Sequence, residues 1–127
     1  MTNSTSLHEE LETLSSKVLD RHRAISSLME ELEAVDWYDQ RAEACTDDEL
    51  RKILIHNRDE EKEHAAMVIE WLRRNDEGFE GHLKTYLFSD RSVVALEAED
   101  TQSDTSSSSS EASEPSLRIG SLKKEAV

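Results

Sequence analysis

The sequence contains few of the residues that interrupt helices or crosslink a chain. Among its 127 residues are one proline, three glycines and one cysteine. Scarce proline and glycine favour long helices over a turn-rich β-fold, and a single cysteine excludes an intrachain disulfide. Hydrophobic residues make up only 35% and aromatic residues 5% of the chain, against roughly 45–50% apolar residues in an average domain. So short a chain, with so little to bury, is expected to form an oligomer.

Basic residues are also few, because 15 lysines and arginines stand against 29 aspartates and glutamates, for a net charge of −14. We therefore expect neither nucleic acid nor an anionic membrane as a partner. No apolar run approaches the roughly 18 residues of a membrane span, and residues 1–10 show no signal-peptide pattern, so we expect a cytoplasmic protein. An acidic chain suits a protein that collects cations, although a solvated acidic surface is the commoner explanation.

The spacing of apolar residues predicts an all-α fold with two long helices. The first starts at a capping box formed by Ser6 and Glu9 and continues to about Cys45, with apolar residues recurring every three or four positions. The second starts at Thr46, which three acidic residues follow, and is expected to stop at Gly78. Because the linker between the helices is short, they should form an antiparallel hairpin.

Beyond the hairpin, the sequence predicts a short third helix that completes a helical domain over residues 1–98. Residues 99–115 have no large apolar side chain and should form a disordered tether. Residues 116–127 combine apolar and basic side chains, a pattern typical of a docking peptide that binds in extended form. A frayed C-terminus is the alternative. The residues expected to dock are Leu117, Ile119, Gly120, Ser121 and Leu122.

Glu61 and His64 form a Glu-x-x-His motif in the apolar stripe of the second helix. On a helical wheel Glu61 lies between Leu54 and Val68, and His64 lies one turn further on at the edge of the same face. A carboxylate in such a position is costly unless it is paired or binds a metal. The residues support two interpretations about equally, a metal site and an ion pair at an interface.

Glu31 falls on the core-facing side of the first helix and is the natural third ligand. Di-iron bundles use a Glu-x-x-His motif on each of two helices and one Glu from each of two others. One chain holds half of that set, so a metal centre needs two copies, which together supply four carboxylates and two imidazoles. Such donors suit iron, although zinc accepts them as well. We therefore expect a homodimer that completes a ferritin-like four-helix bundle.

Trp37 lies almost opposite the main apolar stripe of the first helix, on the same side as Glu30 and Glu33. An outward Trp indicates a second packing surface, and the two glutamates could attract incoming cations. A solvated acidic face with one interface Trp explains the same residues. Tyr38 shares the side of Glu31 and would either hydrogen-bond near the metals or pack at the interface.

Two long segments, residues 29–41 and 56–67, closely resemble the encapsulated ferritins, as do the shorter segments 70–75 and 86–88. Residues 117–123 resemble the peptide that targets cargo to encapsulin shells. The resemblance therefore covers most of the helical part of the chain as well as its tail.

The resemblance implies a ferroxidase that oxidises Fe(II), with dioxygen or peroxide as oxidant, at a di-iron centre between two antiparallel two-helix protomers. It also implies dimers assembled into a ring, usually a decamer, that pass Fe(III) to the lumen of an encapsulin shell for mineral storage. By motif match it implies that Glu31, Glu61 and His64 are the ferroxidase ligands. It also implies that Glu30 and Glu33 are outer metal-entry acids and that Trp37 and Tyr38 are aromatics near the site.

Two other functions stay open from the residues alone. One is a metal-stabilised helical scaffold, or a metal-buffering protein, that binds metal without turnover. The other is a helical interaction module with an ion-paired seam, which binds no metal.

Overall fold

The computed structural model describes residues 6–110 of the chain, and the side chains up to residue 101. The chain divides after Asn75 into two compact units, Met1–Asn75 and Asp76–Val127. The regular elements of the described part are a 3-10 helix and four α-helices, which confirms the all-α prediction. None of these helices combines the length and the apolarity needed to cross a bilayer.

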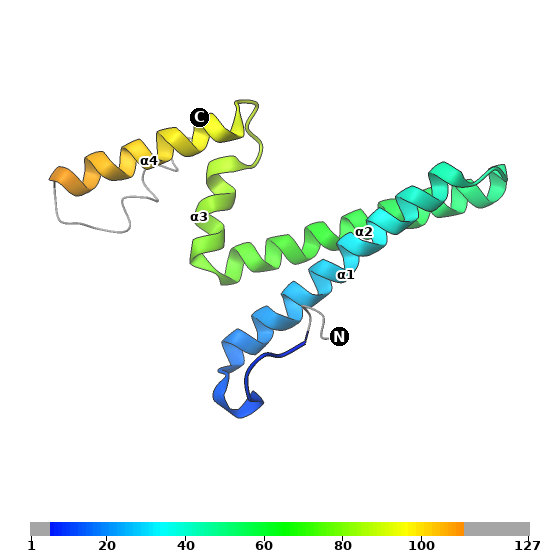
Figure 1. The fold of residues 1–127 in the computed structure, drawn as a ribbon, viewed down its shortest axis with the longest axis horizontal. Helices are drawn as coiled ribbons and strands as arrows, with labels where there is room; N and C mark the ends of the chain where they lie inside the picture. The colour runs from blue at the N-terminus through cyan, green and yellow to red at the C-terminus, as the bar shows by residue number, and fades with distance from the viewer. Residues whose placement is uncertain (1–5, 111–127) are drawn as a thin grey trace. The chain divides into compact units, whose positions relative to one another are not determined.

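Two long helices, α1 (Ser16–Ala44) and α2 (Asp48–Asn75), lie side by side and antiparallel in the first unit (Figure 1). The turn between them is short and held at both ends. Asp47 caps α2, because its Oδ2 accepts a hydrogen bond of 2.8 Å from the backbone N–H of Leu50. The guanidinium of Arg51 donates to the carbonyl oxygen of Cys45. The predicted hairpin is therefore confirmed, with its second cap at Asp47 rather than at Thr46.

The first helix starts later than the capping box at Ser6 predicts. The cap is Ser15, whose Oγ accepts a hydrogen bond of 3.1 Å from the backbone N–H of Val18. Before it, the backbone is extended at Glu10 and at Leu14, and only the short helix η1 (Leu11–Thr13) lies between them. Two extended residues break the backbone hydrogen-bond ladder, so the apolar residues before Ser15 do not continue α1.

The seam between α1 and α2 buries few side chains. Those that are fully buried in the two helices are Ala42, Ala65 and Leu72. Because alanine has little apolar surface to remove from water, the seam stabilises the hairpin only modestly. Many large apolar side chains of the hairpin stay exposed on the single chain: Val18, Ile25 and Leu32 on α1, and Leu50, Ile53, Met67 and Trp71 on α2.

The second unit contains α3 (Glu77–Tyr86) and α4 (Val93–Ser110), which contact each other. Asp76 caps α3, because its Oδ1 accepts a hydrogen bond of 3.0 Å from the backbone N–H of Phe79. Gly78, which we expected to end the second long helix, therefore lies inside α3. Beyond α3, Phe88 takes a φ of 61° in the left-handed region, where a helix cannot continue.

Helix α4 differs from the sequence expectation. It continues to Ser110 and thus includes residues 99–110, which we expected to belong to a disordered tether. No proline precedes Pro115 and no glycine separates α4 from it, so nothing in this stretch obliges a helix to stop. The remaining residues of the expected tether, 111–115, and the expected docking peptide, 116–127, lie outside the described residues.

Candidate metal centre

Three potential metal ligands, Glu31, Glu61 and His64, converge on the hairpin. One ligand atom from each lies within 4.8 Å of the others. Nδ1 of His64 is 3.4 Å from Oε1 of Glu61 and 3.6 Å from Oε1 of Glu31. The three residues that the sequence singles out as ferroxidase ligands therefore lie together in one chain.

The secondary structure explains this convergence. Glu61 and His64 are three residues apart on α2, so their side chains project from the same face on successive turns. Glu31 comes from the antiparallel helix α1 and meets them across the hairpin. The Glu31 and Glu61 side chains are each 26% exposed, and that of His64 is 45% exposed. The cluster is thus shallow and open on one side.

The two carboxyl groups of the cluster behave as a pair. A hydrogen bond to Glu61, followed by burial and by the charge of Glu61, raises the pKa of Glu31 above its usual value. The same hydrogen bond lowers the pKa of Glu61, and His64 lowers it further against the opposing effect of burial. Two carboxylates so close cannot both be ionised without a cost, so Glu31 takes up a proton more readily than an isolated glutamate does.

The imidazole of His64 responds to both carboxylates. Loss of solvent alone would lower its pKa, but the hydrogen bond with Glu61 and the negative charges of Glu31 and Glu61 outweigh this effect and raise the pKa. The cluster therefore attracts positive charge, whether a proton or a cation. Two carboxylates and one imidazole are donors that Fe(II) and Zn(II) both accept. Three donors from one chain leave coordination positions that water, an oxidant or a second chain can fill.

The outer residues that the sequence predicts are not among the three grouped ligands. Glu30 and Glu33 are exposed, and within the described residues neither belongs to a group that could hold a metal. Trp37 is exposed and Tyr38 is half-buried, as their positions on the helical wheel suggest. The guanidinium of Arg41 lies 5.9 Å from the centre of the Trp37 ring and 5.3 Å from that of Tyr38. One arginine thus contacts both aromatic rings by cation–π interactions.

Sequence analysis missed Arg58, which joins the two helices close to the cluster. Its Nη1 lies 3.0 Å from Oδ1 of Asp39 on α1, and its Nε donates a hydrogen bond of 3.0 Å to Oδ1 of Asp59 on α2. Asp39 first, and then Asp59, raise the pKa of the Arg58 guanidinium. Neither helix alone reveals the pair. The pair follows only from an alignment of the two helices that places Glu31 opposite His64. About two turns nearer to the hairpin turn, Asp39 on α1 then lies opposite Arg58 on α2.

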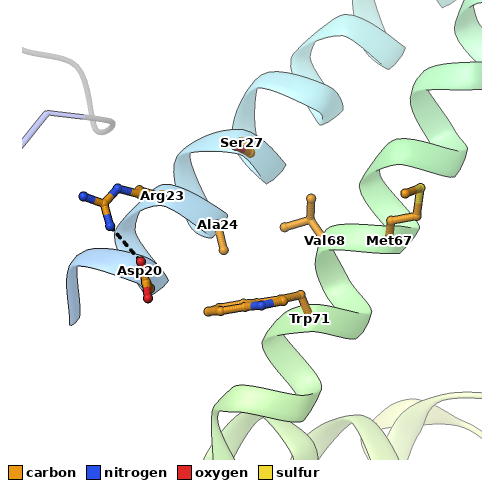
Figure 2. A pocket seen from close by; sticks show the side chains of 7 residues that line it. All are labelled: Asp20, Arg23, Ala24, Ser27, Met67, Val68 and Trp71. Carbon is orange, nitrogen blue, oxygen red and sulfur yellow. Dashed lines mark hydrogen bonds and ion pairs between the residues drawn. The ribbon is translucent and has the colours of Figure 1, made fainter. Parts of the chain in front are cut away.

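An open hollow of about 490 Å³ lies between the helices on the other side of the cluster. Figure 2 shows the Trp71 ring extending across it towards Ala24, with Met67 and Val68 beside it on α2 and Ser27 further along α1. The small side chains of Ala24 and Ser27 leave the space unfilled. Met67 and Trp71 follow His64 by three and seven residues, so this apolar hollow continues the face that carries the cluster.

Comparisons with known proteins agree with the sequence resemblance. The family model described as EncFtn-like matches residues 6–90. A protein of Rhodospirillum rubrum described as an encapsulated ferritin-like protein is 57% identical over 130 aligned positions, which cover 98% of this chain and 93% of that protein. A ferritin-like protein of Thermotoga maritima is 53% identical over 92 positions, 72% of this chain and 81% of its own length.

The fold has a counterpart among solved structures as well. A crystal structure of a protein from Nitrosomonas europaea superimposes with a TM-score of 0.68 at 57% sequence identity. The superposition covers 69% of this chain and 97% of that one.

Proposed function

The chain belongs to the EncFtn-like family, which confirms the resemblance to encapsulated ferritins, and we propose that it is a ferroxidase. It oxidises Fe(II) to Fe(III) at a di-iron site that two copies of the chain form together. The observation that carries this proposal is the convergence of Glu31, Glu61 and His64 within 4.8 Å on one open face of the hairpin.

The donor set favours a centre shared between two copies. Ferritin-like di-iron bundles use four carboxylates and two imidazoles from four helices. One hairpin supplies half of that set, so a second hairpin placed against the same face completes it. That face also carries Leu50, Ile53 and Trp71, whose exposed side chains a second copy would remove from water. Burial of these side chains would add to the modest stabilisation of the single seam.

Each ligand has a definite role in this proposal. Iron is the substrate, and two Fe(II) ions give one electron each. The two electrons pass either to dioxygen, which takes up two protons and becomes hydrogen peroxide, or to hydrogen peroxide, which takes up two protons and becomes water. The two carboxylates can bridge the ions, and His64 supplies a terminal nitrogen. A metal needs its carboxylate ligands ionised, so a cation between Glu31 and Glu61 would compete with a proton for the same place.

The acidic residues outside the cluster complete the proposal. Glu30 and Glu33 would form an exposed entry site that raises the local concentration of cations, and the family resemblance assigns Trp37 and Tyr38 to the surroundings of the centre. The copies form dimers that assemble into a ring. Residues 116–127 dock the ring inside an encapsulin shell in the cytoplasm, and the Fe(III) is stored inside that shell. The residues that make this contact are chiefly Leu117, Ile119, Gly120, Ser121 and Leu122.

Turnover distinguishes this function from metal binding alone. With Fe(II) in excess, a ferroxidase consumes oxygen until the iron is exhausted, whereas a scaffold or a buffer binds a fixed amount and stops. Glu61→Gln and His64→Ala should each abolish rapid oxidation, while Glu63→Gln, an exposed neighbour on the same helix, should leave it unchanged. Native mass spectrometry with and without Fe(II) reports whether the active species contains two copies. Wild-type oxidation rates in Glu61→Gln would refute the assignment.

A further inference from the structure

Among the described residues, the ion pairs that join α1 to α2 include two that differ in place, one inside the cluster and one outside it. The first is His64 with Glu31. The second is Arg58 with Asp39, at 3.0 Å. The Arg58 side chain is 23% exposed and that of Asp39 is 59% exposed, so the solvent is partly excluded on the arginine side of the pair. A planar guanidinium presents several N–H groups in a fixed arrangement, and this one contacts Asp39 with one nitrogen and Asp59 with another.

The hairpin needs such a contact because its other interactions select register weakly. Two of the three buried residues in the two helices are alanines, Ala42 and Ala65. Small side chains interdigitate less than large ones, so they resist a shift along the seam less strongly. A single polar contact placed at a seam is a known way for helices to specify one register.

Within the cluster, the contact between the helices is a longer one. Nδ1 of His64 lies 3.6 Å from Oε1 of Glu31, and the two side chains are 45% and 26% exposed. Arg58 and Asp39 approach more closely, at 3.0 Å, and a guanidinium keeps its charge where an imidazole can lose it. The Arg58 pair therefore joins the two helices at a second level of the seam without depending on the protonation of His64.

Arg58 is well placed for that role. On α2, Arg58 precedes Glu61 by three residues, which is about one turn. On α1, Asp39 follows Glu31 by eight residues, which is about 12 Å at 1.5 Å per residue. A slip of one turn would move Glu31 by about 5.4 Å relative to Glu61 and His64. That displacement exceeds the 4.8 Å within which the three ligand atoms now lie, so the cluster would be lost.

We propose that Arg58 and Asp39 are positioning residues, which fix the register of α1 against α2 and thereby assemble Glu31, Glu61 and His64 into a metal site. Neither residue binds the metal. The effect on metal binding follows from the structure of the single chain, whereas the effect on iron oxidation rests on the proposed ferroxidase function. The two can be tested separately.

Cobalt(II) is a suitable probe, because its visible absorption reports the geometry of its ligands without any redox turnover. Arg58→Met keeps the length and the apolar stem of the side chain but removes the charge and the hydrogen bonds. We expect the affinity for Co(II) to fall about tenfold or more, since misplaced ligand geometry typically costs one to two orders of magnitude. The spectrum at saturating Co(II) should change as well.

Three further variants separate positioning from general stability. Asp39→Asn should produce the same loss as Arg58→Met, and the double variant should be no worse than either single one, because the two residues act as a unit. Arg58→Lys keeps the charge and should restore the wild-type Co(II) spectrum at least partly. Arg91→Met, which removes the pair between Arg91 and Glu99 in the other unit, should leave Co(II) affinity and spectrum unchanged.

The outcomes are distinct. Wild-type Co(II) affinity and spectrum in Arg58→Met, alongside loss of both in Glu61→Gln, would overturn the positioning role and leave the ferroxidase function standing. Wild-type Co(II) binding without oxidation of Fe(II) would refute the ferroxidase function alone. Failure of Arg58→Met, Asp39→Asn and Arg58→Lys to fold at all would show that the pair maintains the fold, and would contradict the proposal. Circular dichroism on each variant gives that answer.

Discussion

The imidazole of His64 on α2 lies 3.6 Å from the carboxylate of Glu31 on α1. This contact crosses the hairpin, so the cluster depends on tertiary structure and not only on the Glu-x-x-His spacing within α2. Either helix alone would present at most two of the three donors.

Glu31→Gln should affect the metal-free and the metal-bound protein in opposite ways. The substitution removes a carboxyl group whose pKa Glu61 raises, so without metal the melting temperature should stay equal or increase slightly. The stabilisation by added Co(II), about 2.7 kcal/mol when the ion is at 100 times its dissociation constant, should largely disappear. Thermal unfolding followed by circular dichroism with and without Co(II) measures both effects. A clear drop in melting temperature without metal would contradict this prediction, and would show that the contact of Glu31 with His64 stabilises the fold more than the crowding of the two carboxyl groups destabilises it.

The pH dependence of metal binding should follow His64. In the metal-free protein the pKa of His64 is raised above 6.5, the value for an unperturbed histidine. Protonated His64 therefore stabilises the fold fully below pH 6.5, and this stabilisation is lost as the pH rises through the raised pKa. A metal needs the neutral imidazole, so its affinity should change in the opposite direction. Co(II) affinity should therefore weaken on acidification while the pH is still above 6.5. Titrations at several pH values test this, and in His64→Ala the weakening should be smaller and shifted to lower pH.

Glu70 should contribute stability that acid removes. It accepts hydrogen bonds of 2.8 Å from both Nε and Nη2 of Arg73, and one of 2.7 Å from Nε of Arg74. These partners, Arg73 first, lower the pKa of Glu70 to about 2. Ionised Glu70 therefore stabilises the fold at pH values above 4.5, which is the pKa of the group in the unfolded chain. This stabilisation is lost as the pH falls towards 2.

The corresponding variant is Glu70→Gln, compared with wild type by urea unfolding at neutral pH and at about pH 3. It should be less stable at neutral pH, and the difference should narrow in acid. Because 42% of the Glu70 side chain is exposed to solvent, which screens its charge, the effect should be small. Glu63→Gln serves as the control, and an equal loss of stability at both pH values would exclude the charge of Glu70 as the cause.

Deletion of residues 116–127 should separate chemistry from delivery. The Fe(II) oxidation rate should stay at the wild-type level, because the cluster lies entirely on the hairpin. Loading into a co-expressed encapsulin shell should be lost. Substitution of serine for Leu117, Ile119 and Leu122 in the full-length chain should have the same effect, since it removes the apolar side chains but keeps the length. Loading of either variant at wild-type levels would refute the docking role.

The hairpin and the cluster could be predicted because both depend on helical periodicity. Glu61 and His64 share a face because they are three residues apart on α2. The linker is so short that α2 has to run back along α1. The start of α1 could not be predicted. Ser6 with Glu9 matches the capping pattern better than Ser15 with Val18, yet the cap forms at Ser15. The capping pattern in the sequence does not show where the backbone hydrogen-bond ladder breaks, so it does not predict which of two candidate caps starts the long helix.

The contact between Arg58 and Asp39 could not be predicted for a different reason. Each residue has nearer opposite charges in its own helix, and an interhelical pair depends on the exact offset between two helices, which apolar spacing leaves uncertain by a turn. The C-terminal end of α4 was missed because a serine-rich stretch has no apolar face from which periodicity could be read.

The three donors of a single hairpin have a consequence for the control of the proposed reaction. A centre built from two identical halves exists only when two chains meet, so its abundance follows the square of the concentration of free chains. In dilute solution the specific activity should fall as the protein is diluted, whereas copies confined in a small volume stay paired. Confinement by itself would then act as the switch that turns iron oxidation on where the product can be retained.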